Sequence, residues 1–380
     1  MDLWEKTTKF SISSFFIIFC LPIFSWGLAQ TQKIAAEPFE YKLLFAENQK
    51  GFPSGRCNFR MCRNLLNLIN KAKVSIDFAI YGIRNQRAIF AALVSAKNRG
   101  VRIRGLVDTH NNFCGKLGEY TYKDTGVLIE SLGGPSIVHC DSGPGYSYIM
   151  HNKFFIFDEK TVWTGSTNIS DTGIGGEFNA NVSIILPSKN IAKIYTQQFE
   201  NLYKGRPRRK EKSPGNYKQV WNDGTEVQVF FSPSDDPITF AINKLIEESQ
   251  NTLFISMFFL THFDVAEKII AAKNRGVEVR MILDGAGSAH ASSQKSFLCE
   301  QGIRLKVENW RGKMHMKLAV ADYADPQKGA VIIGSQNWTI NGNKNNDENT
   351  LYIKNPSVAD EVAEEFLRLW RSLYMVPECR

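Results

Sequence analysis

A six-residue run occurs twice in this chain of 380 residues. Residues 96–101 read Ala-Lys-Asn-Arg-Gly-Val, and residues 272–277 repeat the same order. An aspartate stands at the same offset after each run, Asp108 in the first copy and Asp284 in the second. Self-similarity at a fixed separation is the signature of an internal duplication, in which each copy folds as the same structural unit. The sequence therefore predicts two similar halves.

The expected strands and helices also follow the same order in the two halves. Apolar runs rich in β-branched residues alternate with runs of helical periodicity, which is typical of an α/β layered fold. The predicted strands cover 41–45, 74–81, 101–107, 226–231, 253–260 and 277–283, and the predicted helices cover 57–72, 86–98, 238–249 and 265–274. We place one repeat at 38–203 and the other at 225–380. The basic, proline-broken segment 204–224 between them is expected to be an exposed linker.

The charge and the N-terminus indicate where the chain acts. The formal net charge is +8, which favours an anionic partner such as a phospholipid head group or a nucleic acid, although such charge also serves solubility. Lysines, an apolar run from Phe10 to Leu28 and then small residues are typical of a secretory signal over 1–29. An uncleaved membrane anchor is the alternative. We therefore expect an exported protein, periplasmic or secreted, or one anchored by this segment.

Cysteine usage agrees with export without defining the pairing. The chain has seven cysteines, and six of them lie beyond the N-terminal apolar run. An even number in an exported chain permits disulfides. Cys57 and Cys62 are the closest pair, and their spacing is not a zinc-binding pattern. Free or buried thiols are as consistent with the sequence as any particular bridge.

The same polar side chains occur once in each half: a histidine, a lysine two residues later, and an asparagine beyond a short hairpin. They are His151, Lys153 and Asn168 in the first half, and His315, Lys317 and Asn337 in the second. Residues two apart on a strand face the same side, so each histidine points with its lysine. Asp158 and Asp322 stand at odd spacing and should fix turns instead of contacting a substrate.

These residues suit the cleavage of a phosphodiester. One imidazole can attack phosphorus while a second, protonated one donates to the leaving oxygen. Lysine and asparagine side chains can hold the phosphate oxygens through charge-assisted and neutral hydrogen bonds. Four such donors supply the neutralisation for which other enzymes use a divalent metal, so we expect no metal and no other cofactor.

The paired motifs resemble those of the phospholipase D superfamily, and the flanking α/β repeats extend the resemblance over most of the chain. It implies two α/β/α sandwich repeats packed about a pseudo-twofold axis, with one shared active site. It also implies that one of His151 and His315 forms a phosphohistidine while the other protonates the leaving alcohol and then activates water. The resemblance favours His151 as the nucleophile, although the sequence itself leaves this open.

The family also has an acidic residue that orients a catalytic histidine. Glu177 and Glu348 follow the two asparagine loops, and each precedes an apolar strand. By resemblance, we expect both to orient a histidine. A surface carboxylate is the alternative interpretation at either position.

Four functions fit these features. An exported phospholipase D acting on glycerophospholipid is slightly preferred to an exported nuclease, which would share its chemistry and differ only in the cleft. Phosphatidyl transfer, as in cardiolipin synthases, would replace water with an alcohol, and a non-catalytic phosphate-binding module would not need both histidines. We expect a monomer whose partner is a phospholipid or nucleic-acid phosphodiester, with peripheral membrane contact if the substrate is a lipid.

Overall fold

The computed structural model describes residues 34–35, 38–109, 122, 124–141, 148–205 and 217–374. The segment 1–29, which we predicted to be a secretory signal or an anchor, lies outside these residues. Of the helices in the described part of the chain, none has the length and apolar character needed to cross a membrane.

The first repeat is built on a mixed sheet with the strand order β2-β10-β8-β7-β3-β5-β6. Its strands are β2 (Lys42–Phe45), β3 (Ser75–Ile80), β5 (Arg102–Asp108), β6 (Val138–Asp141), β7 (Lys153–Phe157), β8 (Thr161–Gly165) and β10 (Val182–Leu186), with a separate pair β4 (Ile83–Arg84) and β9 (Ile169–Ser170). Its helices are α1 (Arg60–Lys71), α2 (Arg87–Asn98), α3 (Asp124–Leu132), the π-turn η1 (Asp171–Gly175) and α4 (Lys189–Tyr203).

The second repeat is built on a sheet with the order β1-β11-β12-β18-β17-β16-β13-β14-β15. Its strands are β1 (Ile34–Ala35), β11 (Lys218–Trp221), β12 (Glu226–Ser232), β13 (Thr252–Met257), β14 (Glu278–Leu283), β15 (Arg304–Val307), β16 (Lys317–Ala321), β17 (Ala330–Gly334) and β18 (Glu348–Lys354). Its helices are η2 (Ile238–Asn243), α5 (Lys244–Glu248), α6 (Phe263–Asn274), α7 (Gly285–Ala289), α8 (Lys295–Glu300), α9 (Ile340–Lys344) and α10 (Pro356–Arg371).

The two sheets have the same topology: the spatial order β2-β10-β8-β7-β3-β5-β6 in the first corresponds to β12-β18-β17-β16-β13-β14-β15 in the second. In the first, β3 is parallel to β5 and antiparallel to β7; in the second, β13 is parallel to β14 and antiparallel to β16. This correspondence confirms the predicted α/β class and the predicted duplication.

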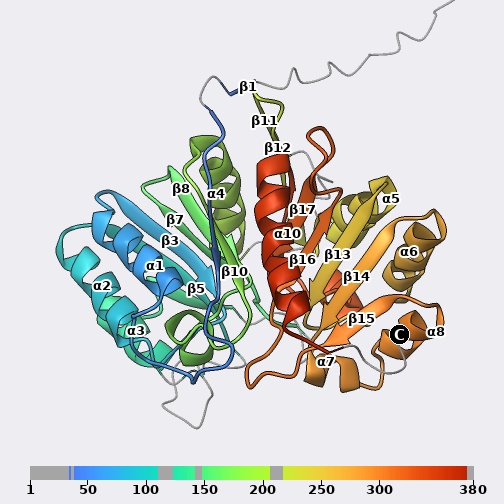
Figure 1. Ribbon diagram of the computed structural model, residues 1–380. Coiled ribbons are helices and arrows are strands. Elements are labelled where there is room, and N and C mark those ends of the chain that lie inside the picture. Colours follow the sequence, from blue (N-terminus) through green and yellow to red (C-terminus); the bar gives the residue numbers. More distant parts are fainter. Residues whose placement is uncertain are drawn as a thin grey trace, which may run out of the picture. The chain divides into compact units, whose positions relative to one another are not determined.

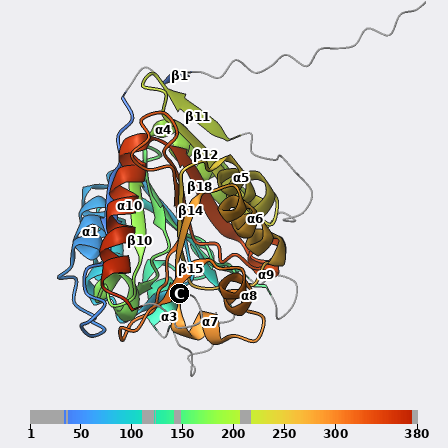
Figure 2. The ribbon, with the colours of Figure 1, turned by 45° about the vertical axis from the view of Figure 1, so that its right-hand side comes forward.

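Two long helices lie between the sheets and join the repeats. Figure 1 shows α4 and α10 between the two sheets, with α1 to α3 and α5, α6 and α8 on the outer faces; Figure 2 gives a second view. One continuous apolar cluster contains Tyr195 and Phe199 of α4 together with Phe366 and Trp370 of α10. Because burying each large apolar side chain stabilises by roughly 1.5–3 kcal/mol, this shared core holds the motifs of both repeats in fixed relation.

The segment 204–224 is not exposed throughout, in contrast to our expectation of a linker. Its last part forms β11, which pairs antiparallel with β12. Trp221 is buried and packs edge-on against Phe39 at 4.9 Å between ring centroids. Burial alternates along this strand, because Gln219 and Trp221 face the core while Lys218 and Val220 remain partly exposed. Residues 206–216 lie outside the described part of the chain.

The aspartate of each motif fixes the turn after its strand, as predicted. The Asp158 carboxylate accepts hydrogen bonds from the backbone N–H groups of Lys73, Val74 and Ser75 at 2.7–3.1 Å. In the second repeat, the Asp322 carboxylate accepts from the N–H groups of residues 250–252. Each aspartate therefore joins its hairpin to the start of the neighbouring strand, β3 or β13.

We expect the stabilising effect of Asp158 to depend on pH. Burial acts to raise the pKa of this carboxyl, but the backbone N–H groups outweigh it, so the net pKa lies below its usual value. A depressed folded-state pKa contributes stability above the unfolded-state value of about 4, and this contribution is lost as the pH falls through the folded value. Asp158→Asn should therefore be less stable than wild type at pH 7, with a smaller difference below about pH 4.

Denaturant unfolding at a series of pH values measures this difference. Glu159→Gln is the matched control, because this neighbouring carboxylate is exposed and bonds only to Arg102 among the described residues. A pH-independent difference for Asp158→Asn would show that its charge does not act through the bound N–H groups.

Candidate active site

His151 is held by residues of the second repeat. Its backbone N–H donates to the carbonyl of Asp347 at 2.8 Å. Its Nδ1 lies 2.7 Å and 2.9 Å from the two carboxylate oxygens of Glu348, which is fully buried. An ionised carboxylate only accepts hydrogen bonds, so Nδ1 carries the proton and Nε2 keeps a free lone pair. Ser335 and Asn346 also donate to this carboxylate, at 2.7 Å and 3.1 Å, and fix its orientation.

His315 is held in the same way by residues of the first repeat. Its backbone N–H donates to the carbonyl of Ala180 at 2.9 Å. Its Nδ1 lies 2.9 Å from the side-chain oxygen of Asn181 and 3.1 Å from the carbonyl oxygen of Ser166. Both are acceptors, so the proton again sits on Nδ1 and Nε2 is free. Each repeat thus orients the histidine of the other, and neither motif is complete without the opposite repeat.

The two lysines are buried beside the histidines. The ammonium groups of Lys153 and Lys317 donate to the carbonyl oxygens of His151 and His315, each at 2.7 Å, and each side chain is 1% exposed. Burial is the main cause that lowers the pKa of Lys153 to about 7 and the pKa of Lys317 well below its usual value. A buried cation without a directly bonded anion is costly, so a bound phosphate would stabilise both ammonium groups.

The electrostatics show that the two motifs share one environment. Burial lowers the pKa of His151 to about 4, against the opposing effect of Glu348, and Lys317 of the other repeat adds to the lowering. Burial also holds the pKa of His315 well below its usual value, assisted by Lys317, Lys153 and His151. Charges shift a pKa appreciably only at short range. The effects of each repeat's charged groups on the histidine pKa of the other repeat therefore agree with the prediction of a single shared site. These low pKa values favour neutral imidazoles at pH 7.

An aromatic ring lies against each histidine–lysine pair, and sequence reasoning missed both rings. Tyr81 lies edge-on to His151, with 5.6 Å between centroids, and below the ammonium of Lys153. In the second repeat, Phe258 lies 5.1 Å from the His315 ring and 4.8 Å from the Lys317 ammonium. Each ring is the first residue after the strand that pairs with the motif, β3 or β13. That repeated position is the signal that could have identified them.

The two asparagines stand in equivalent loops after β8 and β17. The side-chain oxygens of Asn168 and Asn337 are buried and have no hydrogen-bond partner among the described residues. Glycines allow the loops to close, since a Cβ at Gly173 or Gly342 would lie 2.3 Å or 2.4 Å from the Asn168 or Asn337 carbonyl oxygen. Buried polar groups are rarely left without partners, so these oxygens are available to accept a hydrogen bond from a ligand.

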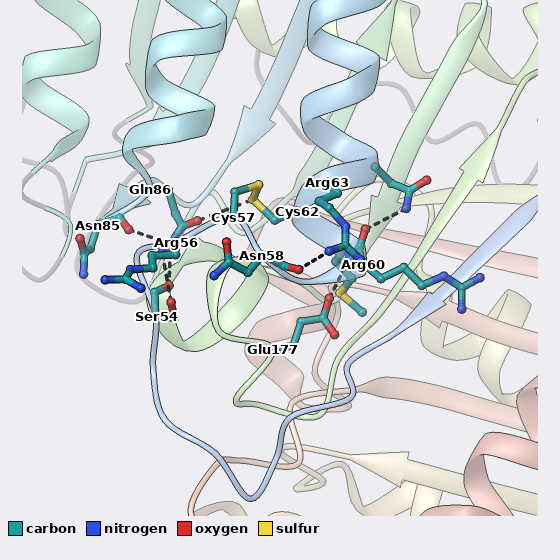
Figure 3. The surroundings of a disulfide bond; sticks show 12 residues. Ser54, Arg56, Cys57, Asn58, Arg60, Cys62, Arg63, Asn85, Gln86 and Glu177 are labelled. Atoms are coloured by element: carbon teal, nitrogen blue, oxygen red, sulfur yellow. Dashed lines mark hydrogen bonds between the residues drawn. A yellow bond between two sulfur atoms is a disulfide. The ribbon is translucent and has the colours of Figure 1, made fainter.

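Glu177 does not take the histidine-orienting role that we expected. Its carboxylate accepts hydrogen bonds from the backbone N–H groups of Met61 at 2.7 Å and Glu47 at 3.0 Å, and so anchors the first turn of α1. Figure 3 shows it below the start of α1, close to the Cys57–Cys62 disulfide that closes the preceding loop.

Asn181 occupies the place that we had assigned to Glu177. Ser183 pairs with Gly165 in the first sheet, and Thr350 pairs with Gly334 in the second, so Asn181 corresponds to Glu348. The two asparagine loops differ in length, and counting from the motif therefore selects the wrong residue. Counting back from the strand, with Asn181 immediately before β10 and Glu348 at the start of β18, would have identified it.

The fold and the site define a two-repeat protein in which paired histidine–lysine motifs meet across a pseudo-twofold axis. The family described as cardiolipin synthase, PLD-like domain, matches residues 65–203 and 242–370. The chain belongs to this family of the phospholipase D superfamily.

Curated relatives resemble part of the chain. A mitochondrial cardiolipin hydrolase from Xenopus tropicalis is 31% identical over 128 residues, which are 33% of this chain and 58% of the relative. A phospholipase D from Rickettsia prowazekii is 26% identical over 148 residues, which are 39% of this chain and 67% of the relative. The chain thus spans little more than half the length of the cardiolipin hydrolase.

A solved structure resembles nearly the whole chain. The phosphatidylserine synthase from Haemophilus influenzae matches 90% of this chain and 88% of its own, with a TM-score of 0.63 and 16% identity. At this identity the likeness shows the fold alone, and it covers both repeats.

Proposed function

We propose that this protein hydrolyses a glycerophospholipid at the head-group side of its phosphodiester, as a phospholipase D, through a phosphohistidine intermediate. The observation that carries the proposal is the reciprocal orientation of the two histidines. Each Nδ1 is bound to an acceptor of the other repeat, which leaves each Nε2 unprotonated, beside a buried lysine that bonds to no carboxylate among the described residues.

The reaction divides into two steps at one phosphorus. Nε2 of His151 attacks phosphorus, the bond to the head-group oxygen breaks, and His315 donates its proton to the leaving alcohol. A water molecule then attacks phosphorus, gives its proton to His315 and breaks the phosphorus–nitrogen bond, which releases phosphatidate and neutral His151. Before the first step, the negative charge of the bound substrate raises the pKa of His315, so that this histidine takes up the proton that it later donates.

The remaining motif residues bind the phosphate. Lys153 and Lys317 approach from the two repeats as charged donors, and the side-chain amides of Asn168 and Asn337 add neutral ones. Donors fixed where charge develops stabilise the transition state without reorganising. We assign these four residues to the non-bridging oxygens and propose that no metal ion is needed for this task.

The lipid substrate is favoured by the proteins that the chain resembles. The matching family and two of the relatives carry names of lipid enzymes. Export is supported by oxidised cysteines. Cys57 and Cys62 form a disulfide with each other, and Cys140 and Cys299 each take part in a disulfide as well. Disulfides persist in oxidising compartments, so we propose a periplasmic or secreted enzyme, either freed from residues 1–29 or anchored by them.

The experiment is a comparison of substrates with the purified protein in the presence of EDTA. Phosphatidylcholine vesicles, cardiolipin vesicles and plasmid DNA are incubated separately, and phosphatidate and DNA nicking are measured. Phosphatidate formation without nicking is the expected result. Nicking without phosphatidate would assign the protein as an exported nuclease, and a phosphatidyl-alcohol formed only with added alcohol would assign it as a phosphatidyltransferase. Activity lost on EDTA addition would contradict the metal-independent chemistry.

A further inference from the structure

The two histidines have unequal partners at equivalent positions of the two repeats. His151 is bonded to the carboxylate of Glu348, whereas His315 is bonded to the carboxamide of Asn181. A serine supports each partner in the same way: Ser335 donates to Glu348 at 2.7 Å, and Ser166 donates to Asn181 at 2.9 Å. The duplication thus keeps the hydrogen-bond geometry and changes only the charge beside one imidazole.

The position of Asn181 is fixed by its surroundings. The side chain is fully buried, its oxygen receives hydrogen bonds from both Ser166 and His315, and its nitrogen donates to the carbonyl of Asn179 at 3.3 Å. Because the oxygen has two donors and the nitrogen an acceptor, the amide has one favourable orientation. Asn181 therefore presents an uncharged acceptor to Nδ1 of His315.

The charge of a partner has opposite effects on the two catalytic tasks. A nucleophilic imidazole gains positive charge as it bonds to phosphorus, so a neighbouring carboxylate stabilises the transition state more than the ground state. An imidazolium that donates a proton loses positive charge, so a carboxylate at its Nδ1 would hold back the proton. A neutral acceptor orients the ring without this cost.

The other charged groups that face His315 agree with this distinction. Burial is the main cause that keeps its pKa low, and the largest electrostatic effects, from Lys317, Lys153, His151 and Lys313, act in the same direction. At His151, by contrast, Glu348 is the largest electrostatic cause and favours the charged ring. The neighbouring charges therefore favour the charged ring more at His151, through Glu348, than at His315.

We infer that Asn181 is a positioning residue that makes His315 the proton donor to the leaving alcohol and leaves His151, paired with Glu348, as the nucleophile. This inference rests on the proposed phosphodiesterase function, and it adds the residue that divides the two roles. It predicts that, in the first step, Asn181 matters only when the leaving group needs a proton.

Two substrates with the same phosphatidyl group and different leaving groups test this. Phosphatidylglycerol releases an aliphatic alcohol that must be protonated, whereas phosphatidyl-p-nitrophenol releases a stabilised phenolate that need not be. We measure the first turnover of each by rapid quench for wild type, Asn181→Leu, Asn181→Asp and Glu348→Gln. The expected result for Asn181→Leu is a glycerol release at least about 10-fold slower, because a misplaced general acid forfeits much of its 10²–10⁴-fold contribution. Its nitrophenol burst should stay within about 3-fold of wild type, because that step needs no acid.

Asn181→Asp and Glu348→Gln change the charge of each histidine's partner while keeping the size of the side chain. Asn181→Asp keeps an acceptor and raises the pKa of His315, so the pH profile of glycerol release should move to higher pH while that of the nitrophenol burst stays in place. Glu348→Gln should slow the first turnover of both substrates. Thermal unfolding of each variant checks whether the fold is retained.

The outcomes separate the inference from the proposed function. A wild-type protein inactive on both lipids would overturn the proposed function itself. If the wild type is active, two results would overturn the division of roles. One is that the Asn181 variants slow the first turnover of both substrates equally. The other is that Asn181→Asp moves the pH profile of the nitrophenol burst. Loss of the burst in Asn181→Leu with burst retained in Glu348→Gln would reverse the assignment of the two histidines.

Discussion

Replacing His151 with alanine should lower kcat/KM for phosphodiester hydrolysis at least about 100-fold, because nucleophilic and acid–base groups contribute 10²–10⁴-fold or more. The variant loses the only atom that we assign to bond with phosphorus. It should also lose the intermediate. Wild-type protein quenched during turnover of a substrate labelled with phosphorus-32 should retain label, whereas His151→Ala should not.

His139→Ala is the matched control for this variant. This imidazole stacks on Tyr203, with 3.8 Å between centroids, and its Nδ1 lies 3.1 Å from the Tyr203 carbonyl at the end of α4. Its removal should cost stability and leave the rate per folded molecule near that of wild type. A His151→Ala protein that keeps more than about a hundredth of wild-type kcat/KM would exclude a direct role for this histidine.

Replacing Glu348 with glutamine should reduce kcat by up to about 10⁴-fold, the loss seen when the acidic partner of a catalytic histidine is replaced by its amide. Glutamine keeps the size of the side chain, but it can present its NH₂ group to Nδ1 of His151 and so favour the wrong tautomer. It also loses the negative charge that stabilises the developing imidazolium. The KM should change less than kcat, because Glu348 contacts the histidine and not the phosphate.

Glu177→Gln provides the comparison, because Glu177 is an equally buried carboxylate in the other repeat. It holds two backbone N–H groups, so its neutralisation should lower the free energy of unfolding by about 1–3 kcal/mol. Its kcat should stay within a few-fold of wild type. If both variants lost activity equally at equal stability, the distinction between an orienting carboxylate and an anchoring one would be wrong.

The contrast between Glu348 and Glu177 shows where sequence reasoning succeeds. Glu348 was found because it opens an apolar strand directly beyond its asparagine loop, where strand register fixes its side. Glu177 was misassigned because it lies in a loop of different length, and distance along a loop does not fix position in space. Asn181 was missed because a resemblance that prescribes an acid directs attention away from an amide.

The sequence by itself determined the local chemistry and its repetition. The recurring run and the paired histidine–lysine motifs fixed an α/β duplication, and period-two spacing placed each lysine on the side of its histidine. The tertiary structure alone decided which group each imidazole meets, since those partners come from the other repeat, 197 residues away for Glu348 and 134 for Asn181. No local pattern encodes such contacts, because they arise only when α4 and α10 bury their apolar faces between the two sheets.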